Sequence, residues 1–285
     1  MRDPLLRQLR NPLLPLYFWR ESCVSAQARR AIVSTLAVIP ARLGATRLPR
    51  KPLRLLAGAP LVVRVWERVT ALGLADRCVI ATDSPEVELA ARHAGAECVR
   101  TRSDHPSGTD RVAEVAGRPE FLRYDVIVNV QGDEPFIPTE ALEGAVESVS
   151  SGRFPIGTAA ARASAEILAN PSIVKVVCTD DGRALYFSRA PIPFAADDAA
   201  AGLARGMVRQ HIGIYAYSPD ALQRWVTLPP HPLERIEKLE QLRPLAAGMA
   251  IGVATLDVAS PGGIDTEDDL VRANARWTDL IAGRV

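Results

Sequence analysis

Short apolar runs alternate with longer segments of helical periodicity from Leu36 to Val149, and this alternation constrains the fold more than any other feature of the chain. The apolar runs are typical of strands and comprise Leu36–Ile39, Arg77–Thr82, Glu97–Arg100 and Asp125–Val130. The other segments are typical of helices and comprise Pro60–Leu74, Pro85–Ala94, Gly108–Val115 and Thr139–Val149. Strands that alternate with helices favour a parallel sheet covered by helices on both faces. We therefore predict an α/β fold with a mostly parallel sheet.

The second half of the chain has a different pattern, in which few helices separate the strand-like runs. These runs are Gly157–Ala163, Ile173–Cys178, Ala184–Phe187 and His211–Tyr217. They predict antiparallel additions that form a second layer or lid. We also expect a single domain of residues 35–285 that contains an inserted subregion at about residues 180–245. Ala195–Gly206 is small and polar and predicts a flexible loop, whereas Leu233–Leu245 and Thr266–Trp277 return to helical periodicity.

The first 34 residues do not fit this pattern. Leu5–Phe18 is apolar but is interrupted by Pro12 and Pro15, and it lacks the clean apolar core and the cleavage site of a secretory signal. Two interpretations stay open: residues 1–34 are non-native sequence upstream of a true start near Val33, or they are a poorly ordered extension. No run in the sequence approaches the ~20 apolar residues of a membrane helix, so we expect no membrane segment.

The charge balance argues against a nucleic-acid partner. The 34 Lys and Arg residues are matched by 33 Asp and Glu residues, which gives a net charge of +1 instead of a strongly basic surface. The four cysteines are widely spaced, and no pair has the spacing of a metal or redox site. This cysteine usage fits a reducing cytoplasm.

A cationic loop follows the first predicted strand. Arg42, Arg47, Arg50 and Lys51 lie in this loop together with two prolines, which lower the entropy that the loop loses when it orders around a ligand. Polar loops at the carboxyl ends of strands in α/β sheets are usually ligand sites. The loop is therefore suited to a polyphosphate, and solvated surface arginines are the alternative. The loop lacks both the Walker pattern and G-x-G-x-x-G, which argues against a dinucleotide cofactor.

Lysine is rare in this chain. Only Lys51, Lys175 and Lys238 occur among the 34 Lys and Arg residues. A chain that uses arginine for nearly every positive charge keeps lysine where a compact ammonium is wanted. Of the three lysines, only Lys51 lies where a contact with a phosphate ligand is expected on chemical grounds.

Two acidic segments are candidate metal sites. Gln131-Gly132-Asp133-Glu134-Pro135 directly follows a predicted buried strand, and a carboxylate there is well placed for Mg²⁺, which binds one or two carboxylates plus substrate phosphates. Asp265 precedes the last predicted helix and is a candidate second ligand. The alternatives are structural, because Gly132 and Asp133 suit a turn and Asp265 or Thr266 suits a helix cap.

A polar loop opens the predicted helix at Gly108. Ser107 and Gly108 present a hydroxyl and a backbone N–H group, which suit a base or a phosphate, although an ordinary helix cap explains Ser107 equally well.

The second half supplies candidates for an anionic substrate. Arg189 and His211 lie at the ends of predicted strands and together suit an anion, whereas an interior histidine is the alternative for His211 and core packing is the alternative for Tyr215. Glu240 and Gln241 lie near the end of an amphipathic helix, whose charged face is by default solvated.

Taken together and in this order, these motifs resemble those of the 3-deoxy-manno-octulosonate (Kdo) cytidylyltransferase family. The matching segments are IPAR and TRLP-x-KPL (39–53), ATD (81–83), TR-x-DH-x-SGT-x-R (101–111), VIVNVQGDEP (126–135), KVV (175–177), ALYFSRA-x-IP (184–193), H-x-GIY-x-Y (211–217), PLE-x-IE-x-LEQLR (232–243) and DT-x-x-DL (265–270). The match runs from Leu36 to about Ala275. IPAR with KPL is shared with other sugar nucleotidyltransferases, but the combination is specific.

The resemblance implies a Rossmann-like nucleotidyltransferase fold and a Mg²⁺-dependent reaction in which CTP and Kdo give CMP-Kdo and pyrophosphate for lipopolysaccharide biosynthesis. The anomeric hydroxyl of the sugar acid attacks the α-phosphorus in line, which needs positioning and charge neutralisation more than a covalent nucleophile. The resemblance also implies a cytoplasmic homodimer.

The resemblance assigns a role to each candidate residue. It places Arg42, Arg47 and Lys51 at the triphosphate, Ser107 and Gly108 at the cytidine base, and Gln131 near the nucleotide or sugar. It places Asp133 and Asp265 on Mg²⁺, with Arg42, Lys51 and Asp133 as the catalytic residues. It assigns the Kdo pocket to Arg189, His211, Tyr215, Glu240 and Gln241. The chain departs from the family pattern at Arg50, Gln210 and Ala216.

Two alternatives to Kdo activation stay open at this point. A related ulosonic acid, 8-amino-Kdo or sialic acid, is the alternative substrate. A nucleotide-binding regulatory module without turnover is the alternative class, but it predicts the loss of a metal carboxylate or of the loop lysine, and Lys51, Asp133 and Asp265 are all present.

Overall fold

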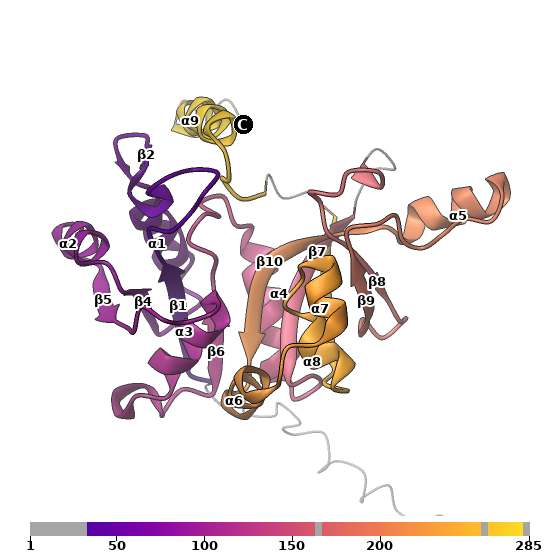
Figure 1. Cartoon of the computed structure of the whole chain (residues 1–285), viewed down its shortest axis with the longest axis horizontal. Coiled ribbons are helices and arrows are strands. Elements are labelled where there is room, and N and C mark those ends of the chain that lie inside the picture. Colours follow the sequence, from indigo (N-terminus) through magenta and orange to yellow (C-terminus); the bar gives the residue numbers. More distant parts are fainter. Residues whose placement is uncertain (1–32, 163–166, 258–261, 282–285) are drawn as a thin grey trace, which may run out of the picture. The chain divides into compact units, whose positions relative to one another are not determined.

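The computed structural model describes residues 33–162, 167–257 and 262–281, and nine strands within these ranges form one mixed sheet (Figure 1). The main path of the sheet runs in the order β11 (Ile251–Leu256), β7 (Ile156–Arg162), β10 (Arg209–Tyr217), β6 (Val126–Asn129), β1 (Thr35–Ala41), β4 (Arg77–Thr82) and β5 (Glu97–Arg100). β8 (Lys175–Cys178) pairs with β10, and β9 (Ala184–Ser188) pairs with β8. A separate short hairpin consists of β2 (Leu55–Leu56) and β3 (Ala59–Pro60).

Strand directions divide the sheet into two parts. β6, β1, β4 and β5 are parallel to one another, as are β7 and β11. β10 is antiparallel to both β6 and β7 and joins these two parallel groups. β8 and β9 are antiparallel to each other, and β8 is antiparallel to β10. The predicted α/β fold, with a mostly parallel sheet and antiparallel additions from the second half, is therefore confirmed.

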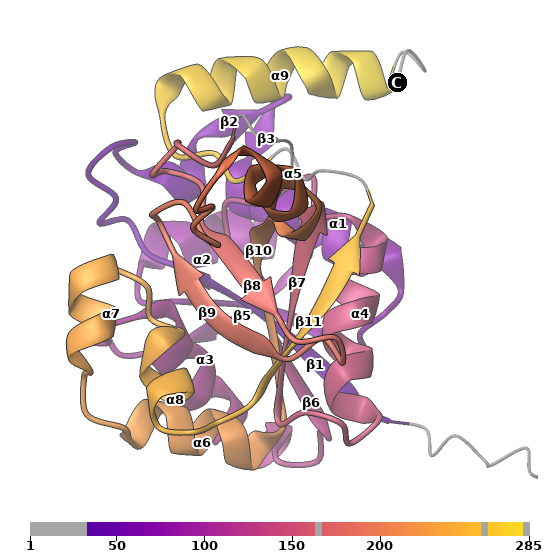
Figure 2. The same ribbon diagram turned by 90° about the vertical axis from the view of Figure 1, so that its right-hand side faces the viewer.

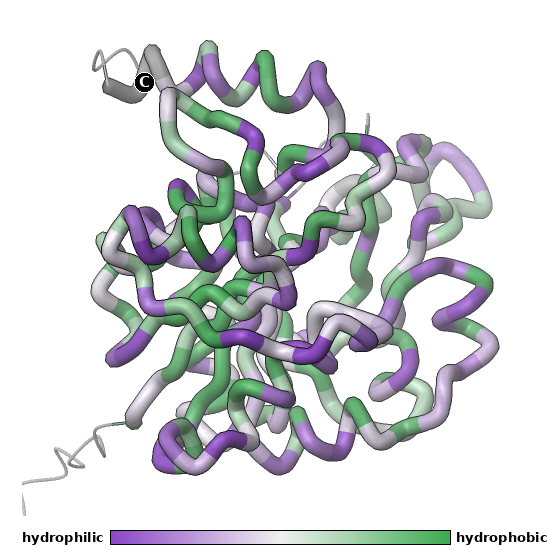
Figure 3. The backbone as a smooth tube through the Cα atoms, turned by 60° about the vertical axis from the view of Figure 1, so that its left-hand side comes forward, coloured by the Kyte–Doolittle hydropathy of each residue, from purple (hydrophilic) through white to green (hydrophobic). Residues whose placement is uncertain are grey.

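Side chains of each strand alternate between two apolar cores, one on each face of the sheet, because strand residues point to opposite faces with a period of two. In β1, Leu36 and Val38 enter one core, whereas Ala37 and Ile39 enter the other. The first core is covered by α3 (Gly108–Ala116) and α6 (Pro219–Thr227). The second is covered by α1 (Leu61–Leu72), α2 (Pro85–His93) and α4 (Thr139–Ser150). Figure 3 shows the hydrophobic residues concentrated in the interior of the fold.

The segment predicted to be a flexible loop at Ala195–Gly206 is instead a helix, α5 (Asp198–Met207). Its alanines have the highest helix propensity of any residue. The Asp197 side chain caps the helix by accepting a hydrogen bond from the backbone N–H of Ala200 at 2.8 Å. The prediction was wrong because small residues were interpreted as loop formers without weighing helix propensity and the cap.

The single helix predicted at Leu233–Leu245 is two short helices, α7 (Pro232–Glu237) and α8 (Leu242–Ala246). Lys238 lies between them with a φ of 56°, a left-handed conformation that ends an α-helix. Figure 2 shows α4 and α8 on opposite sides of the strands. The last helix, α9, spans Glu267–Ile281, and the short 3₁₀ helices η1 and η2 span Lys51–Leu53 and Pro119–Phe121.

Residues Val33–Val285 form one compact unit. Both interpretations of residues 1–34 concern a segment that, apart from Val33 and Ser34, lies outside the described residues. Among the helices that the structure describes, none has the length and apolar character needed to cross a membrane.

The close contact between β7 and α4 predicts that a larger residue at Gly157 lowers the stability of the protein. Gly157 packs so closely that an added Cβ would lie 2.1 Å from the carbonyl oxygen of Ala145 in α4. We expect Gly157→Ala to lower the free energy of unfolding by about 3 kcal/mol, because overpacking forces backbone to move. Urea denaturation measures this change.

The matched control is Gly202→Ala in α5, where no atom lies within 4 Å of the added Cβ. This variant should unfold at the same or a slightly higher urea concentration, since alanine favours helix more than glycine does. Equal midpoints for the two variants would contradict the close packing of β7 on α4.

Candidate active site

The carboxyl ends of β1 and β6 bring two of the predicted polar loops together. The two strands are parallel neighbours, so the loops that follow them leave from the same edge of the sheet. An added Cβ at Gly132 would lie 3.0 Å from the carbonyl oxygen of Pro40. A larger residue would push the loops apart, so this glycine is explained by packing as well as by turn geometry.

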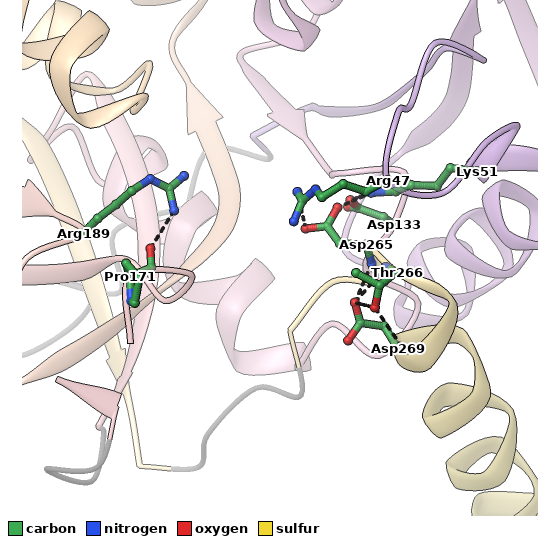
Figure 4. A network of polar contacts seen from close by, with 8 residues as sticks. All are labelled: Arg47, Lys51, Asp133, Pro171, Arg189, Asp265, Thr266 and Asp269. Atoms are coloured by element: carbon green, nitrogen blue, oxygen red, sulfur yellow. Dashed lines mark hydrogen bonds and ion pairs between the residues drawn. The ribbon is translucent and has the colours of Figure 1, made fainter. Parts of the chain in front are cut away.

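A lysine and two aspartates from three separate segments meet at this edge (Figure 4). Lys51 Nζ donates a hydrogen bond to Asp265 Oδ1 at 2.8 Å and a second one to Asp133 Oδ2. Arg47 Nη2 donates to the other oxygen of Asp265 at 2.9 Å. The Lys51 side chain is only 15% exposed, and that of Asp133 is 22% exposed, so solvent screens this pair weakly.

The pKa of Lys51 reflects these partners. Burial disfavours the ammonium, but the charges and hydrogen bonds of Asp133 and Asp265 outweigh it and raise the pKa of Lys51 above its usual value. The lysine is therefore a permanent cation between two carboxylates.

Backbone contacts hold Asp265 in place. Asp269 Oδ2 accepts hydrogen bonds from the backbone N–H groups of Asp265 at 3.0 Å and Thr266 at 2.9 Å. The N–H of Ile264 donates to the carbonyl oxygen of Asp133 at 2.9 Å, which ties this segment to the loop after β6. Asp269 thus orders the backbone at the start of α9, and the side chain of Asp265 faces Lys51.

A cavity beside the lysine collects the residues predicted to bind the nucleotide. Six of them line it: Arg42, Lys51, Ser107, Gly108, Gln131 and Asp133. Arg47 is not part of this lining and instead contacts Asp265. Ser107 also caps α3, since its hydroxyl accepts a hydrogen bond from the N–H of Asp110 at 3.2 Å. The helix cap is therefore confirmed for Ser107, and its place in the cavity lining leaves ligand binding as a prediction.

Two ionisable residues of the cavity lining, His105 and Arg111, were not predicted. Arg111 is 3% exposed and forms an ion pair with Asp83 at 3.0 Å. It lies one helical turn after Ser107, and that spacing could have indicated a shared face. His105 lies 2.5 Å from Glu114 through its Nε2 atom. Burial opposes the charge of Glu114, but hydrogen bonds from the Arg102 N–H, Arg118 and His105 lower the pKa of Glu114 to about 2.

Arg189 lies apart from the Lys51 cluster, at the end of β9 (Figure 4). Its Nε donates to the carbonyl oxygen of Glu237 at 3.0 Å, and its Nη1 donates to the carbonyl oxygen of Pro171 at 3.0 Å. Its backbone N–H donates to Glu237 Oε2 at 2.9 Å. Nη2 makes no hydrogen bond to any described residue, so it is available to an anion.

His211 and Tyr215 lie on β10, on the apolar side of the sheet that Phe187 also lines. His211 Nε2 lies 3.0 Å from Thr158 Oγ1, and its ring lies 5.2 Å from Phe187 and 5.4 Å from Tyr215 between centroids. Burial lowers the pKa of His211 to about 3, so the imidazole is neutral near pH 7. His211 therefore offers an anion a neutral ring instead of a positive charge.

Glu240 and Gln241 lie between α7 and α8. Glu240 Oε1 lies 2.9 Å from Ser107 Oγ, which connects this segment to the cavity loop. Burial raises the pKa of Glu240, against the effect of hydrogen bonds from Ser107 and Thr109. Gln241 is buried at the start of α8. Neither residue lies on a solvated helix face, which was the default interpretation.

The chain is similar to known cytidylyltransferases. The cytidylyltransferase family model matches residues 36–251. A 3-deoxy-manno-octulosonate cytidylyltransferase of Gemmatimonas aurantiaca is 66% identical over 247 residues, which cover 87% of this chain and 95% of the relative. One from Polynucleobacter asymbioticus is 47% identical over 239 residues, which cover 83% of this chain and 93% of the relative.

Two solved structures are also similar. CMP:2-keto-3-deoxy-manno-octonic acid synthetase complexed with CTP has a TM-score of 0.79 and 37% identity, with 87% of this chain and 99% of the other covered. 4-Diphosphocytidyl-2C-methyl-D-erythritol synthase from Anaerococcus prevotii has a TM-score of 0.58 and 11% identity, with 86% and 99% covered. The second similarity concerns the fold alone.

Because His211 is neutral in the folded chain, we expect the stability of the protein to depend on pH. Its pKa in the folded chain, about 3, is below the unperturbed value of 6.5, so the folded state binds fewer protons between these two values. Its contribution to stability is complete above pH 6.5 and is lost, by up to about 1.4 kcal/mol per pH unit, as the pH falls toward 3. We expect His211→Gln to make the loss of stability below pH 6.5 less steep.

Urea denaturation at several pH values between 4 and 8 measures this slope. His93→Gln, which removes an exposed imidazole at the end of α2, is the matched control and should leave the slope unchanged. If the His211 variant has the same slope as the wild type, the imidazole is not held neutral.

Proposed function

Because the chain belongs to the 3-deoxy-manno-octulosonate cytidylyltransferase family, we propose that it transfers CMP from CTP to the anomeric hydroxyl of Kdo. The products are CMP-Kdo and pyrophosphate, and the activated sugar serves lipopolysaccharide biosynthesis. The observation that carries this proposal is the cavity at the carboxyl ends of β1 and β6, which brings together Arg42, Lys51, Ser107, Gly108, Gln131 and Asp133. These are the residues that the family resemblance assigns to the nucleotide and metal.

The chain's own residues supply positioning and charge. Arg42 and Lys51 neutralise the triphosphate, with Arg47 nearby. Ser107 and Gly108 line the same cavity and are the residues that we propose for the cytidine base. The anomeric hydroxyl oxygen of the sugar acid forms a bond to the α-phosphorus as the bond from that phosphorus to the pyrophosphate oxygen breaks, and the hydroxyl proton passes to water. Fixed cations favour this step because negative charge on the leaving pyrophosphate grows in the transition state. A covalent enzyme intermediate is not needed.

The sugar acid is held from the other half of the chain. Arg189 Nη2 is available to the Kdo carboxylate, because Nε and Nη1 are already bound to carbonyl oxygens. The neutral ring of His211 suits the sugar ring, and Tyr215 supports it from the core, with 5.4 Å between the two ring centroids. Glu240 and Gln241 suit the hydroxyl groups of the sugar. Glu240 also contacts Ser107, so the two halves of the proposed site are in direct contact.

The carboxylates of Asp133 and Asp265 fit Mg²⁺, because both converge on a single positive charge, the Lys51 ammonium. The described residues contain no group of three or more His, Cys, Asp or Glu side chains that could hold a metal ion. Two carboxylates are sufficient for Mg²⁺ when substrate phosphates complete its coordination. When bound, the ion would add to the neutralisation of phosphate charge. We infer that Lys51 holds the place of this cation and moves to the triphosphate when the nucleotide binds.

We also propose a cytoplasmic homodimer. The segment before α5 and the helix itself expose large apolar side chains: Phe194 is 89% exposed, Leu203 is 76% exposed and Met207 is 52% exposed. Figure 1 shows α5 reaching away from the sheet. An apolar surface of this kind favours contact with protein, and a second copy of the chain is the partner that the family resemblance implies.

Pyrophosphate release tests the function. Purified protein is assayed with CTP, Mg²⁺ and, in turn, Kdo, 8-amino-Kdo and sialic acid. We expect the highest kcat/KM with Kdo and no reaction without Mg²⁺. No release with any sugar acid would overturn the enzyme proposal, and faster turnover of 8-amino-Kdo or sialic acid would replace Kdo as the substrate.

The same assay tests the proposed roles of Asp133 and Lys51. We expect Asp133→Asn and Lys51→Ala each to lower kcat by about 10²–10³-fold, because each removes one placed charge at the reacting phosphates. Asp180→Asn, at an exposed carboxylate in the turn between β8 and β9, is the control and should keep wild-type turnover. Wild-type rates in Asp133→Asn or Lys51→Ala would remove that residue from the site.

A further inference from the structure

Lys175, the first residue of β8, is a lysine buried without a carboxylate partner. Its exposed fraction is 0%. Its Nζ donates hydrogen bonds to the carbonyl oxygens of Asn170 at 2.9 Å and Ile173 at 2.7 Å, and to that of Arg189. An ammonium has three donors, and here each meets a backbone carbonyl. No acidic side chain among the described residues forms an ion pair with it.

Such an arrangement needs an explanation, because burying a charge is unfavourable unless hydrogen bonds compensate for it. An apolar side chain of similar length would fill the same space without this cost. The ammonium instead joins two segments, because it donates two hydrogen bonds to the turn at residues 170–173 and one to the end of β9. The chain has only two other lysines, Lys51 and Lys238, so lysine is not its default cation.

Both of the segments that Lys175 joins also involve Arg189. The Arg189 carbonyl oxygen is one of the three acceptors. The turn that supplies the other two also contains Pro171, whose carbonyl oxygen accepts the hydrogen bond from Arg189 Nη1 at 3.0 Å (Figure 4). Lys175 thus fixes the backbone of Arg189 and, separately, the backbone group that orients its guanidinium.

Glu237 completes the support on the other side. Its Oε2 accepts from the Arg189 N–H at 2.9 Å, its Oε1 accepts from Ser188 Oγ at 2.6 Å, and its carbonyl oxygen accepts from Arg189 Nε at 3.0 Å. Since Nε and Nη1 are both held, rotation of the guanidinium is restricted. Nη2 is the one terminal nitrogen without a hydrogen bond to the described residues.

We propose that Lys175 is a positioning residue for the sugar acid, which holds Arg189 so that Nη2 is presented to the substrate carboxylate. This inference rests on the proposed function and on the assignment of Arg189 to the sugar acid. The lysine touches neither substrate. Lys175 raises the fraction of molecules in which Arg189 is oriented to bind the sugar acid. It therefore affects the affinity for the sugar acid and not the affinity for CTP.

The test is Lys175→Met, which keeps the length and apolar stem of the side chain and removes all three donors. We expect the KM for Kdo to rise about tenfold, as it does when only about a tenth of the molecules hold the binding conformation. The KM for CTP and kcat should change less than about twofold. Lys238→Met removes an exposed lysine and should leave both KM values at the wild-type level.

A double-mutant cycle with Arg189→Ala separates positioning from a merely structural role. If Lys175 acts through Arg189, Lys175→Met should have no further effect on the KM for Kdo once Arg189 is removed. An additive effect, or a rise in the KM for CTP equal to that for Kdo, would overturn the proposal. If Lys175→Met does not fold, Lys175→Gln, which keeps an amide donor, takes its place with the same expected pattern.

The failure of this inference is distinguishable from failure of the proposed function. A wild-type protein that releases no pyrophosphate with any sugar acid refutes the function. A wild-type protein that turns over Kdo, with a Lys175→Met variant whose KM for Kdo is unchanged, refutes the positioning role alone.

Discussion

The ion pairs of Lys51 with Asp133 and Asp265 are the interaction on which the site depends. They join the loop after β1, the loop after β6 and the segment before α9, which are far apart in the sequence. Without the ammonium, two partly buried carboxylates would face each other and repel. A further negative charge next to these carboxylates is unfavourable. Burial and then the charge of Asp133 raise the pKa of the neighbouring Glu134 to about 8.

Local patterns were sufficient to predict the fold class and most of its elements. The strand Arg77–Thr82 has the predicted bounds, because a strand buried within a parallel sheet is a short apolar run. The edge strand Glu97–Arg100 also has the predicted bounds, although only its two central residues are buried. The insertion of β10 between β6 and β7 could not be predicted, because strand order depends on contacts between residues far apart in the sequence. The break at Lys238 was missed for a related reason. The amphipathic pattern continues across it, and only the backbone conformation shows that the helix ends.

The nucleotide half of the candidate site was more predictable than the sugar half. Arg42 and Lys51 follow β1, and Gln131 and Asp133 follow its neighbour β6, so position along the sequence predicts position in space. In the sugar half, Arg189 and His211 were predicted together to suit an anion, with an interior histidine as the alternative for His211, and burial makes His211 neutral. The partners of Arg189 are backbone carbonyls of Pro171 and Glu237, and Lys175 acts on the same backbone. Backbone acceptors leave no signal in the residue types, so this network could be found only from the structure.

The central claim is that Lys51 occupies the place of a cation between Asp133 and Asp265. Binding of Mn²⁺ to the nucleotide-free protein tests it most directly, with the free ion followed by electron paramagnetic resonance in the wild type, Lys51→Met and Asp133→Asn. Removal of the ammonium leaves Asp133 without its cation and Asp265 with Arg47 alone, so Lys51→Met should bind Mn²⁺ more tightly than the wild type, and Asp133→Asn should bind it more weakly. Binding by Lys51→Met that is equal to or weaker than that of the wild type would contradict the claim.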